Sequence, residues 1–130
     1  MDEEQFFKER GDSNIFNQAA HTIIINRKRS EFNKTFEFYK IDDHQTVVEA
    51  VMECLYNKQL NSVIIEGGSK TIQFFINAGL WDEARVITNT ALYLKKGVNA
   101  PLLYDRRLKT SFNILTDRID FFQKNNNDSL

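Results

Sequence analysis

Hydrophobic runs in the first third of the chain predict two β-strands. Residues 22–26 have the sequence Thr-Ile-Ile-Ile-Asn, which is apolar and rich in β-branched side chains. Such a run is typical of a strand that is covered on both faces. Residues 36–41 alternate in polarity, with Phe36 and Phe38 on the same side, which favours a second strand.

The spacing of apolar residues becomes helical over residues 46–56. Apolar side chains recur there on one side of a helix and polar ones on the other. The apolar positions are Val47, Val48, Val51, Met52 and Leu55, and the polar positions are Glu49, Glu53 and Asn57. Asp42 with Gln45 three residues later has the pattern of a capping box. We expect a helix packed on the sheet, with Cys54 as a small core residue rather than a nucleophile.

The most informative segment is residues 62–69, with the sequence Ser-Val-Ile-Ile-Glu-Gly-Gly-Ser. It predicts a buried strand over residues 63–65 and a tight turn at Gly67 and Gly68. Ser69 is the expected N-cap of a helix that carries Ile72, Phe75 and Ile76 on one face and ends at Gly79.

Two interpretations of this turn stay open at the level of the residues. Backbone N–H groups at a helix start bind anions such as phosphate, but two glycines also serve simply to make a sharp turn. Glu66 stands at the carboxyl end of the predicted strand, where a carboxylate is costly unless it is paired or faces a ligand. It could accept hydrogen bonds from sugar hydroxyls or bind the amides of the turn.

The last third of the chain predicts antiparallel strands. An acidic turn at Asp82 and Glu83 precedes a strand through Val86 and Thr88, and residues 111–115 and 118–122 form a terminal hairpin. Neighbouring side chains on a strand face opposite sides, which argues against a catalytic carboxylate pair. We expect a turn or an ion pair with Arg85 instead.

The ends of the chain and one basic segment are less patterned. Residues 1–20 predict only a short helix over residues 3–9, and residues 125–130 a frayed tail. The segment Arg27-Lys28-Arg29 follows the first predicted strand. It could bind a phosphate or form a solvated loop.

Composition excludes several classes of protein. The 130 residues are 42% hydrophobic and carry a net charge of −1, which excludes general disorder and argues against nucleic-acid binding. One cysteine and two histidines exclude a disulfide scaffold and a zinc site. The sequence has neither a signal-peptide pattern nor a membrane-spanning run, so we expect a cytoplasmic protein without a membrane partner.

The segment at residues 62–68, the helix after it and residues 79–86, Gly-Leu-Trp-Asp-Glu-Ala-Arg-Val, resemble one known family, as do residues 97–101, Gly-Val-Asn-Ala-Pro. They are similar to the C-terminal part of the pyrimidine reductase of riboflavin biosynthesis, usually the second domain of a bifunctional deaminase–reductase. The similarity extends from about residue 22 to the C-terminus, with residues 21–124 as the C-terminal half of the reductase-like domain. It implies an α/β class: a partial three-layer fold like dihydrofolate reductase, with parallel central strands in a mixed sheet and a C-terminal antiparallel hairpin.

The resemblance also implies an activity. The family uses NADPH to reduce the ribosyl group of 5-amino-6-(5-phosphoribosylamino)uracil, and the nicotinamide supplies the hydride. Its substrate-binding glutamate corresponds to Glu66. Its cofactor-binding positions correspond to Gly68, Ser69, Lys70, Thr71, Ile72, Gln73 and Phe74. No catalytic residue is assigned.

Departures from the family pattern qualify this expectation. The initial K-x-A-x-S-x-D-G strand and the deaminase motifs do not occur in the sequence, and Lys95 replaces the first glycine of a G-x-G loop. We therefore expect a truncated reductase that is inactive alone and forms a homodimer or pairs with a missing reductase half. The alternative is a non-catalytic module that oligomerises or binds a nucleotide or sugar phosphate, so enzymatic activity itself stays open.

Overall fold

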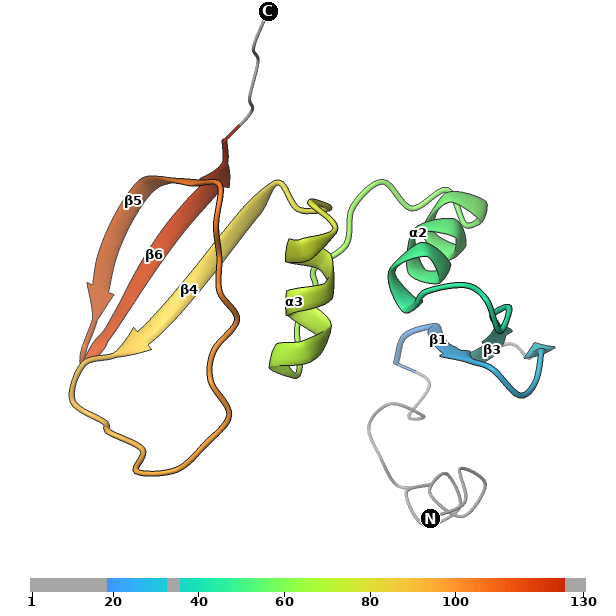
Figure 1. Cartoon of the computed structure of the whole chain (residues 1–130), viewed down its shortest axis with the longest axis horizontal. Coiled ribbons are helices and arrows are strands. Elements are labelled where there is room, and N and C mark those ends of the chain that lie inside the picture. Colours follow the sequence, from blue (N-terminus) through green and yellow to red (C-terminus); the bar gives the residue numbers. More distant parts are fainter. Residues whose placement is uncertain (1–18, 33–35, 126–130) are drawn as a thin grey trace, which may run out of the picture. The chain divides into compact units, whose positions relative to one another are not determined.

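The structure is a computed structural model that describes residues 19–32 and 36–125. They form two compact units, of which the first ends at Ser62 and the second begins at Val63 (Figure 1). The described part of the first unit contains β1 (Thr22–Asn26), β2 (Glu31–Phe32), β3 (Phe36–Lys40) and α2 (Val47–Asn57). The second contains α3 (Ser69–Asn77), β4 (Glu83–Asn89), β5 (Arg106–Ile114) and β6 (Asp117–Lys124). The α/β class is confirmed, whereas the expected helix over residues 3–9 lies outside the described residues.

The first unit holds a mixed sheet in the order β1-β3-β2. β1 runs parallel to β3, with Thr22 opposite Phe36, and β2 runs antiparallel to β3. Both strands predicted for this region are confirmed. The parallel pair and the antiparallel edge strand make the sheet mixed, as expected.

Helix α2 buries only part of the face that was predicted. Its buried residues are Val48, Ala50 and Cys54, whereas Val47 and Met52 are exposed. Small side chains at positions 50 and 54 allow close packing along a narrow stripe, so the larger neighbours lie outside it. Cys54 is a buried core residue, as predicted, and its burial raises the pKa of its thiol.

The cap of α2 also differs from the prediction, because Thr46 and Glu49 form the capping box instead of Asp42 and Gln45. The Thr46 Oγ1 atom accepts a hydrogen bond from the Glu49 N–H at 3.2 Å, and Glu49 Oε2 accepts one from the Thr46 N–H at 2.8 Å. Asp42 instead accepts a hydrogen bond from the His44 N–H at 3.0 Å. Asp42 thus stabilises the turn before the helix, and the helix begins one turn later than expected.

The second unit holds an antiparallel sheet in the order β4-β6-β5. The terminal hairpin and the strand through Val86 are confirmed, and β5 begins earlier than predicted, at Arg106. The expected ion pair of Arg85 with Asp82 or Glu83 is wrong. The Arg85 guanidinium lies over the Phe121 ring, 5.1 Å from its centroid, on the same face of the sheet.

The predicted strand at residues 63–65 is wrong. This run belongs to no sheet among the described residues, and Ile64 is 83% exposed. A strand needs the backbone of a neighbour, and β1 to β6 all pair within the two sheets described above. An apolar run is therefore necessary for a buried strand but does not suffice for one.

Candidate functional site at the start of helix α3

The diglycine turn leads directly into α3. Gly67 has a φ of +120°, a conformation that side-chain-bearing residues rarely adopt, so this position requires glycine. Gly68 is the N-cap and Ser69 the first helical residue, which corrects the predicted N-cap by one position. Because glycine has no side chain, the chain enters the helix without a side-chain cap.

The first turn of α3 is left open to an external hydrogen-bond acceptor. The Thr71 and Ile72 N–H groups both donate to the Gly68 carbonyl, at 3.0 and 3.3 Å. No side chain caps this end, and its first turn contains no acidic residue. The partial positive charge of the helix start is therefore not compensated within the helix. Helix α2 contrasts with this arrangement, because its own capping box satisfies its first turn.

The space beside the turn fits an anion. A Cβ atom added to Gly67 or Gly68 would meet no atom within 4 Å. Lys70 and Thr71, in the first turn, are both exposed, and the Lys70 side chain adds a cation there. Backbone donors, an open approach and a nearby cation are the features with which proteins bind phosphate groups at helix ends.

Glu66 stands immediately before the turn and is exposed. Within the part of the chain that the structure describes, its carboxylate forms no hydrogen bond with the amides of Gly67 or Gly68. Its oxygens are accordingly accessible to the hydroxyl groups of a ligand.

The implied cofactor residues fall into two groups. Four of them make up the helix start, and three lie further along α3: Gly68, Ser69, Lys70 and Thr71 in the first group, and Ile72, Gln73 and Phe74 in the second. The Gln73 carboxamide binds the chain that leads into β5: Oε1 accepts a hydrogen bond from Leu102 N–H at 2.8 Å, and Nε2 donates to Leu102 O at 3.3 Å. This contact joins residues 29 positions apart, and no local pattern in the sequence predicts it.

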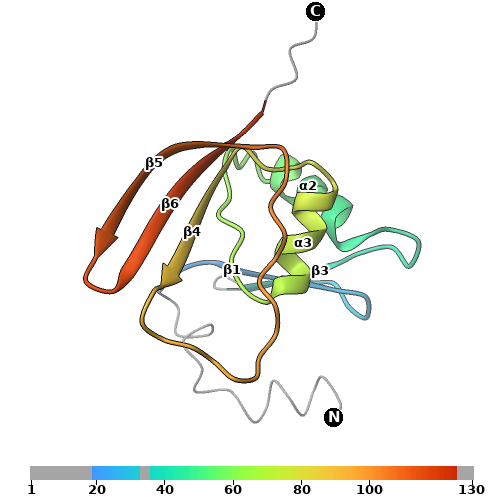
Figure 2. The ribbon, with the colours of Figure 1, turned by 60° about the vertical axis from the view of Figure 1, so that its left-hand side comes forward.

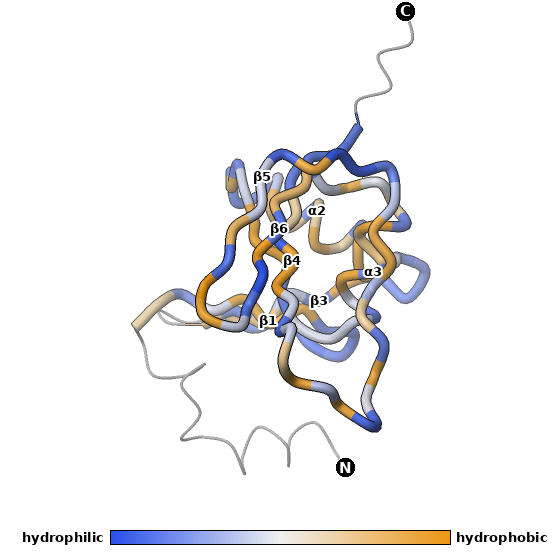
Figure 3. Tube along the Cα trace, turned by 90° about the vertical axis from the view of Figure 1, so that its left-hand side faces the viewer, coloured by the Kyte–Doolittle hydropathy of each residue, from blue (hydrophilic) through white to orange (hydrophobic). Residues whose placement is uncertain are grey.

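The loop between β4 and β5 contains Lys95. Figure 3 shows hydrophobic and hydrophilic positions mixed along this loop, and Lys95 and Lys96 are both exposed. The last part of this loop passes beside α3 (Figure 2).

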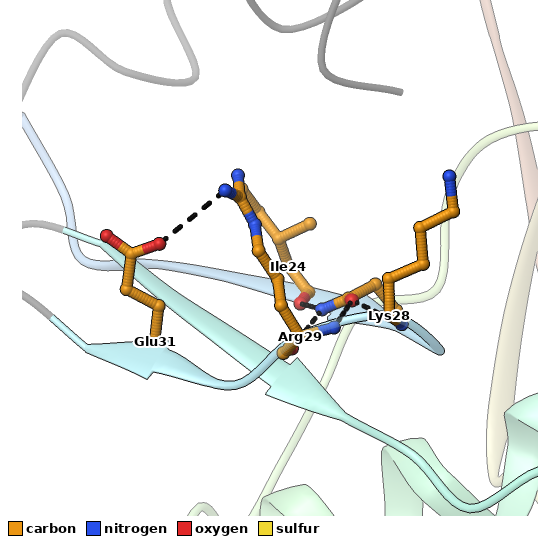
Figure 4. Close-up of polar contacts among 5 residues, drawn as sticks. Ile24, Lys28, Arg29 and Glu31 are labelled. Atoms are coloured by element: carbon orange, nitrogen blue, oxygen red, sulfur yellow. Dashed lines mark hydrogen bonds and ion pairs between the residues drawn. The ribbon is translucent and has the colours of Figure 1, made fainter. Parts of the chain in front are cut away.

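The basic segment after β1 is engaged within the first unit. The Arg27 guanidinium donates to the carbonyls of Asp42 and Gln45 at 2.5 and 2.8 Å. The Arg29 guanidinium carbon lies 3.7 Å from the centroid of the Phe38 ring. Its Nη1 atom lies 3.6 Å from Glu31 Oε2 (Figure 4). These contacts favour the interpretation of the segment as a loop over its interpretation as a phosphate-binding site.

A charged cluster that the sequence did not predict lies in the first unit. The Lys58 ammonium group pairs with the Glu37 carboxylate, and His21 Nε2 lies 3.7 Å from the same carboxylate oxygen. The hydrogen bond to Glu37 raises the pKa of Lys58. The cluster joins the start of β1, the middle of β3 and the end of α2, so its members are distant in sequence and share no motif.

Comparison with known proteins finds one family whose model matches most of the chain. The model of the RibD C-terminal domain family matches residues 5–92. This range includes Glu66 and the whole of α3, extends into the segment at residues 1–20, and leaves out β5 and β6. No curated protein matches the chain. Among the described residues, no helix is long and apolar enough to cross a membrane.

Proposed function

Because the chain belongs to the RibD C-terminal domain family, we propose that it is part of an NADPH-dependent reductase of riboflavin biosynthesis that acts in the cytoplasm. The substrate would be 5-amino-6-(5-phosphoribosylamino)uracil. The observation that carries the proposal is the uncapped start of α3 after the diglycine turn, within the segment that matches the family. Such a helix start is suited to the phosphates of a dinucleotide.

Different residues of the turn would bind the cofactor and the substrate. The backbone N–H groups of Ser69 and Lys70 would donate to phosphate oxygens, and the Lys70 ammonium group would add an attractive charge. Glu66 would accept hydrogen bonds from hydroxyl groups of the substrate. NADPH supplies the hydride when bound, so the task of these residues is to bind and orient the two reactants.

Substitutions of Gly68 test the proposal. Nothing lies within 4 Å of a Cβ at this position and its φ is −67°, so Gly68→Asn and Gly68→Asp are both sterically allowed. Both residues are good N-caps and should leave the helix at least as stable as glycine does. They have the same shape, but only Asp is charged, and a carboxylate beside a bound phosphate repels it by about 1 kcal/mol or more.

The measurement is a titration of the chain with NADPH, followed by energy transfer from Trp81, its one tryptophan. We expect the Asp variant to bind roughly tenfold more weakly than the Asn variant, since 1.4 kcal/mol corresponds to a factor of ten. Equal affinities of these two variants, or no binding by the wild type, would contradict the proposal.

A second candidate function is a non-catalytic module that forms homo-oligomers. One face of the β4-β6-β5 sheet carries a row of apolar side chains in register, Ile87, Ile119 and Phe112. Ile87 is 66% exposed, and Phe112 is exposed as well. Contiguous exposed apolar side chains of this kind mark interaction surfaces.

Sedimentation equilibrium tests this candidate. A dimer should form through the apolar row, and Ile87→Lys should convert it to a monomer, because a charge at the centre of an apolar contact is costly. The matched control is Thr88→Lys, the next residue along β4, whose side chain lies on the opposite face. A wild-type chain that stays monomeric at high concentration rejects this candidate.

A further inference from the structure

A short segment before β5 is fastened along α3 at two points. The side-chain oxygen and nitrogen of Gln73 both bind the backbone of Leu102, as described above. Its Nε2 atom also donates to Asn77 Oδ1 at 2.8 Å. The Tyr104 hydroxyl donates to the same Asn77 oxygen. We call residues 102–104 the strap. Figure 2 shows the chain that contains it passing beside α3.

The strap and the helix run in the same direction. Leu102 is level with Gln73 and Tyr104 with Asn77. Two residues of extended chain rise by about 6.6 Å, and four residues of helix by about 6 Å, so the two paths advance together. Continued backwards from Leu102, the chain approaches the level of the helix start within about two to three residues. The strap therefore determines how the end of the loop between β4 and β5 approaches the diglycine turn.

We infer that Gln73 is a positioning residue, which fixes the strap and thereby the loop carrying Lys95 and Lys96 relative to the phosphate-binding start of α3. This inference rests on the proposed function. The Gln73 oxygen accepts a hydrogen bond from Leu102, and its NH₂ group donates to Leu102 and Asn77. Both polar atoms of the carboxamide therefore already form hydrogen bonds within the protein. The resemblance implies a direct cofactor contact for Gln73, whereas the geometry points to an indirect role.

The contact itself can be tested without a ligand. Gln73→Met keeps the length of the side chain but removes its hydrogen bonds. The amide hydrogen of Leu102 should then exchange with solvent about fivefold faster, which corresponds to about 1 kcal/mol for a lost hydrogen bond. Amide exchange followed by nuclear magnetic resonance reports this site directly. An unchanged exchange rate at Leu102 would overturn the inference.

Tyr104→Phe separates an indirect role from a direct one. It removes a single hydroxyl group at the far end of the strap, at the level of the last residue of α3. If the strap positions the loop, this variant and Gln73→Met should each weaken NADPH binding by about two- to fivefold, and the double variant should weaken it by less than the product.

The possible outcomes distinguish the inference from the proposed function. If Gln73→Met weakens NADPH binding while Tyr104→Phe leaves it unchanged, Gln73 contacts the cofactor directly. That result overturns the inference but leaves the proposed function standing. If neither variant changes the affinity, the strap has no positioning role, which also overturns the inference. If the wild-type chain does not bind NADPH, the proposed function fails and the inference fails with it.

Discussion

At the scale of single residues, Glu37 is the centre of the charged cluster in the first unit. Its side chain is 14% exposed, and Lys58 and His21 approach the same carboxylate oxygen from different elements. A carboxylate withdrawn from water in this way requires its partner, because removal of one partner leaves an uncompensated charge. None of these contacts could be predicted from the sequence, since each residue alone is an ordinary polar position of a strand, a helix end or a loop.

The pH dependence of stability reports the pairing of Lys58. Its pKa is raised above the ordinary value of 10.5 in the folded chain, so its contribution is fully present below that value. The contribution is lost as the pH rises above 10.5 through the folded pKa. We expect Lys58→Met to lower the midpoint of thermal unfolding at pH 7, and the difference from wild type to shrink above pH 10.5. Lys96→Met, at an exposed loop position, should change neither; an equal effect of both variants would contradict this role.

At the scale of elements, the predictions succeed where a pattern is local. β1, β3, the body of α2 and the hairpin of β5 and β6 follow from the spacing of apolar residues. The prediction fails at residues 63–65, where the formation of a strand depends on distant partners. The start of α2 lies between these cases, because Asp42 and Thr46 both suit an N-cap and the local sequence does not distinguish them.

The capping box of α2 gives a direct stability prediction. Thr46→Ala removes the acceptor of the Glu49 N–H and should lower the free energy of unfolding of the first unit by about 1 kcal/mol. Asp42→Ala, at the position that the sequence favoured as the cap, should cost less, because Asp42 holds only a turn. Urea denaturation compares the two variants, and a larger loss for Asp42→Ala would contradict the assignment.

The same capping box predicts a response to acid. Hydrogen bonds from the Thr46 backbone and hydroxyl group lower the pKa of Glu49 below its ordinary value of 4.5. The stabilisation is therefore present above pH 4.5 and is lost as the pH falls through the folded pKa. The difference in stability between wild type and Glu49→Gln should decrease over that range. A difference that stays constant down to pH 2 would show that the ionised carboxylate does not contribute.

At the scale of the whole molecule, family membership and the open start of α3 both support the proposed reductase function. The family match covers the diglycine turn, and the structure leaves the first turn of α3 without a capping side chain. The turn and the helix could be predicted from the sequence, whereas the binding roles of Glu66 and Gly68 stay predictions. The contacts of Gln73 with the strap could not, because they join segments that are distant in the sequence.

The most direct test of the central claim is a titration of the isotope-labelled chain with NADPH, observed through the backbone amides by nuclear magnetic resonance. We expect the largest shifts at the N–H groups at the start of α3, those of Gly67, Gly68, Ser69 and Lys70. Inorganic phosphate should shift the same amides at higher concentration. Saturable shifts confined to other parts of the chain, or no shifts at the diglycine turn, would contradict the claim.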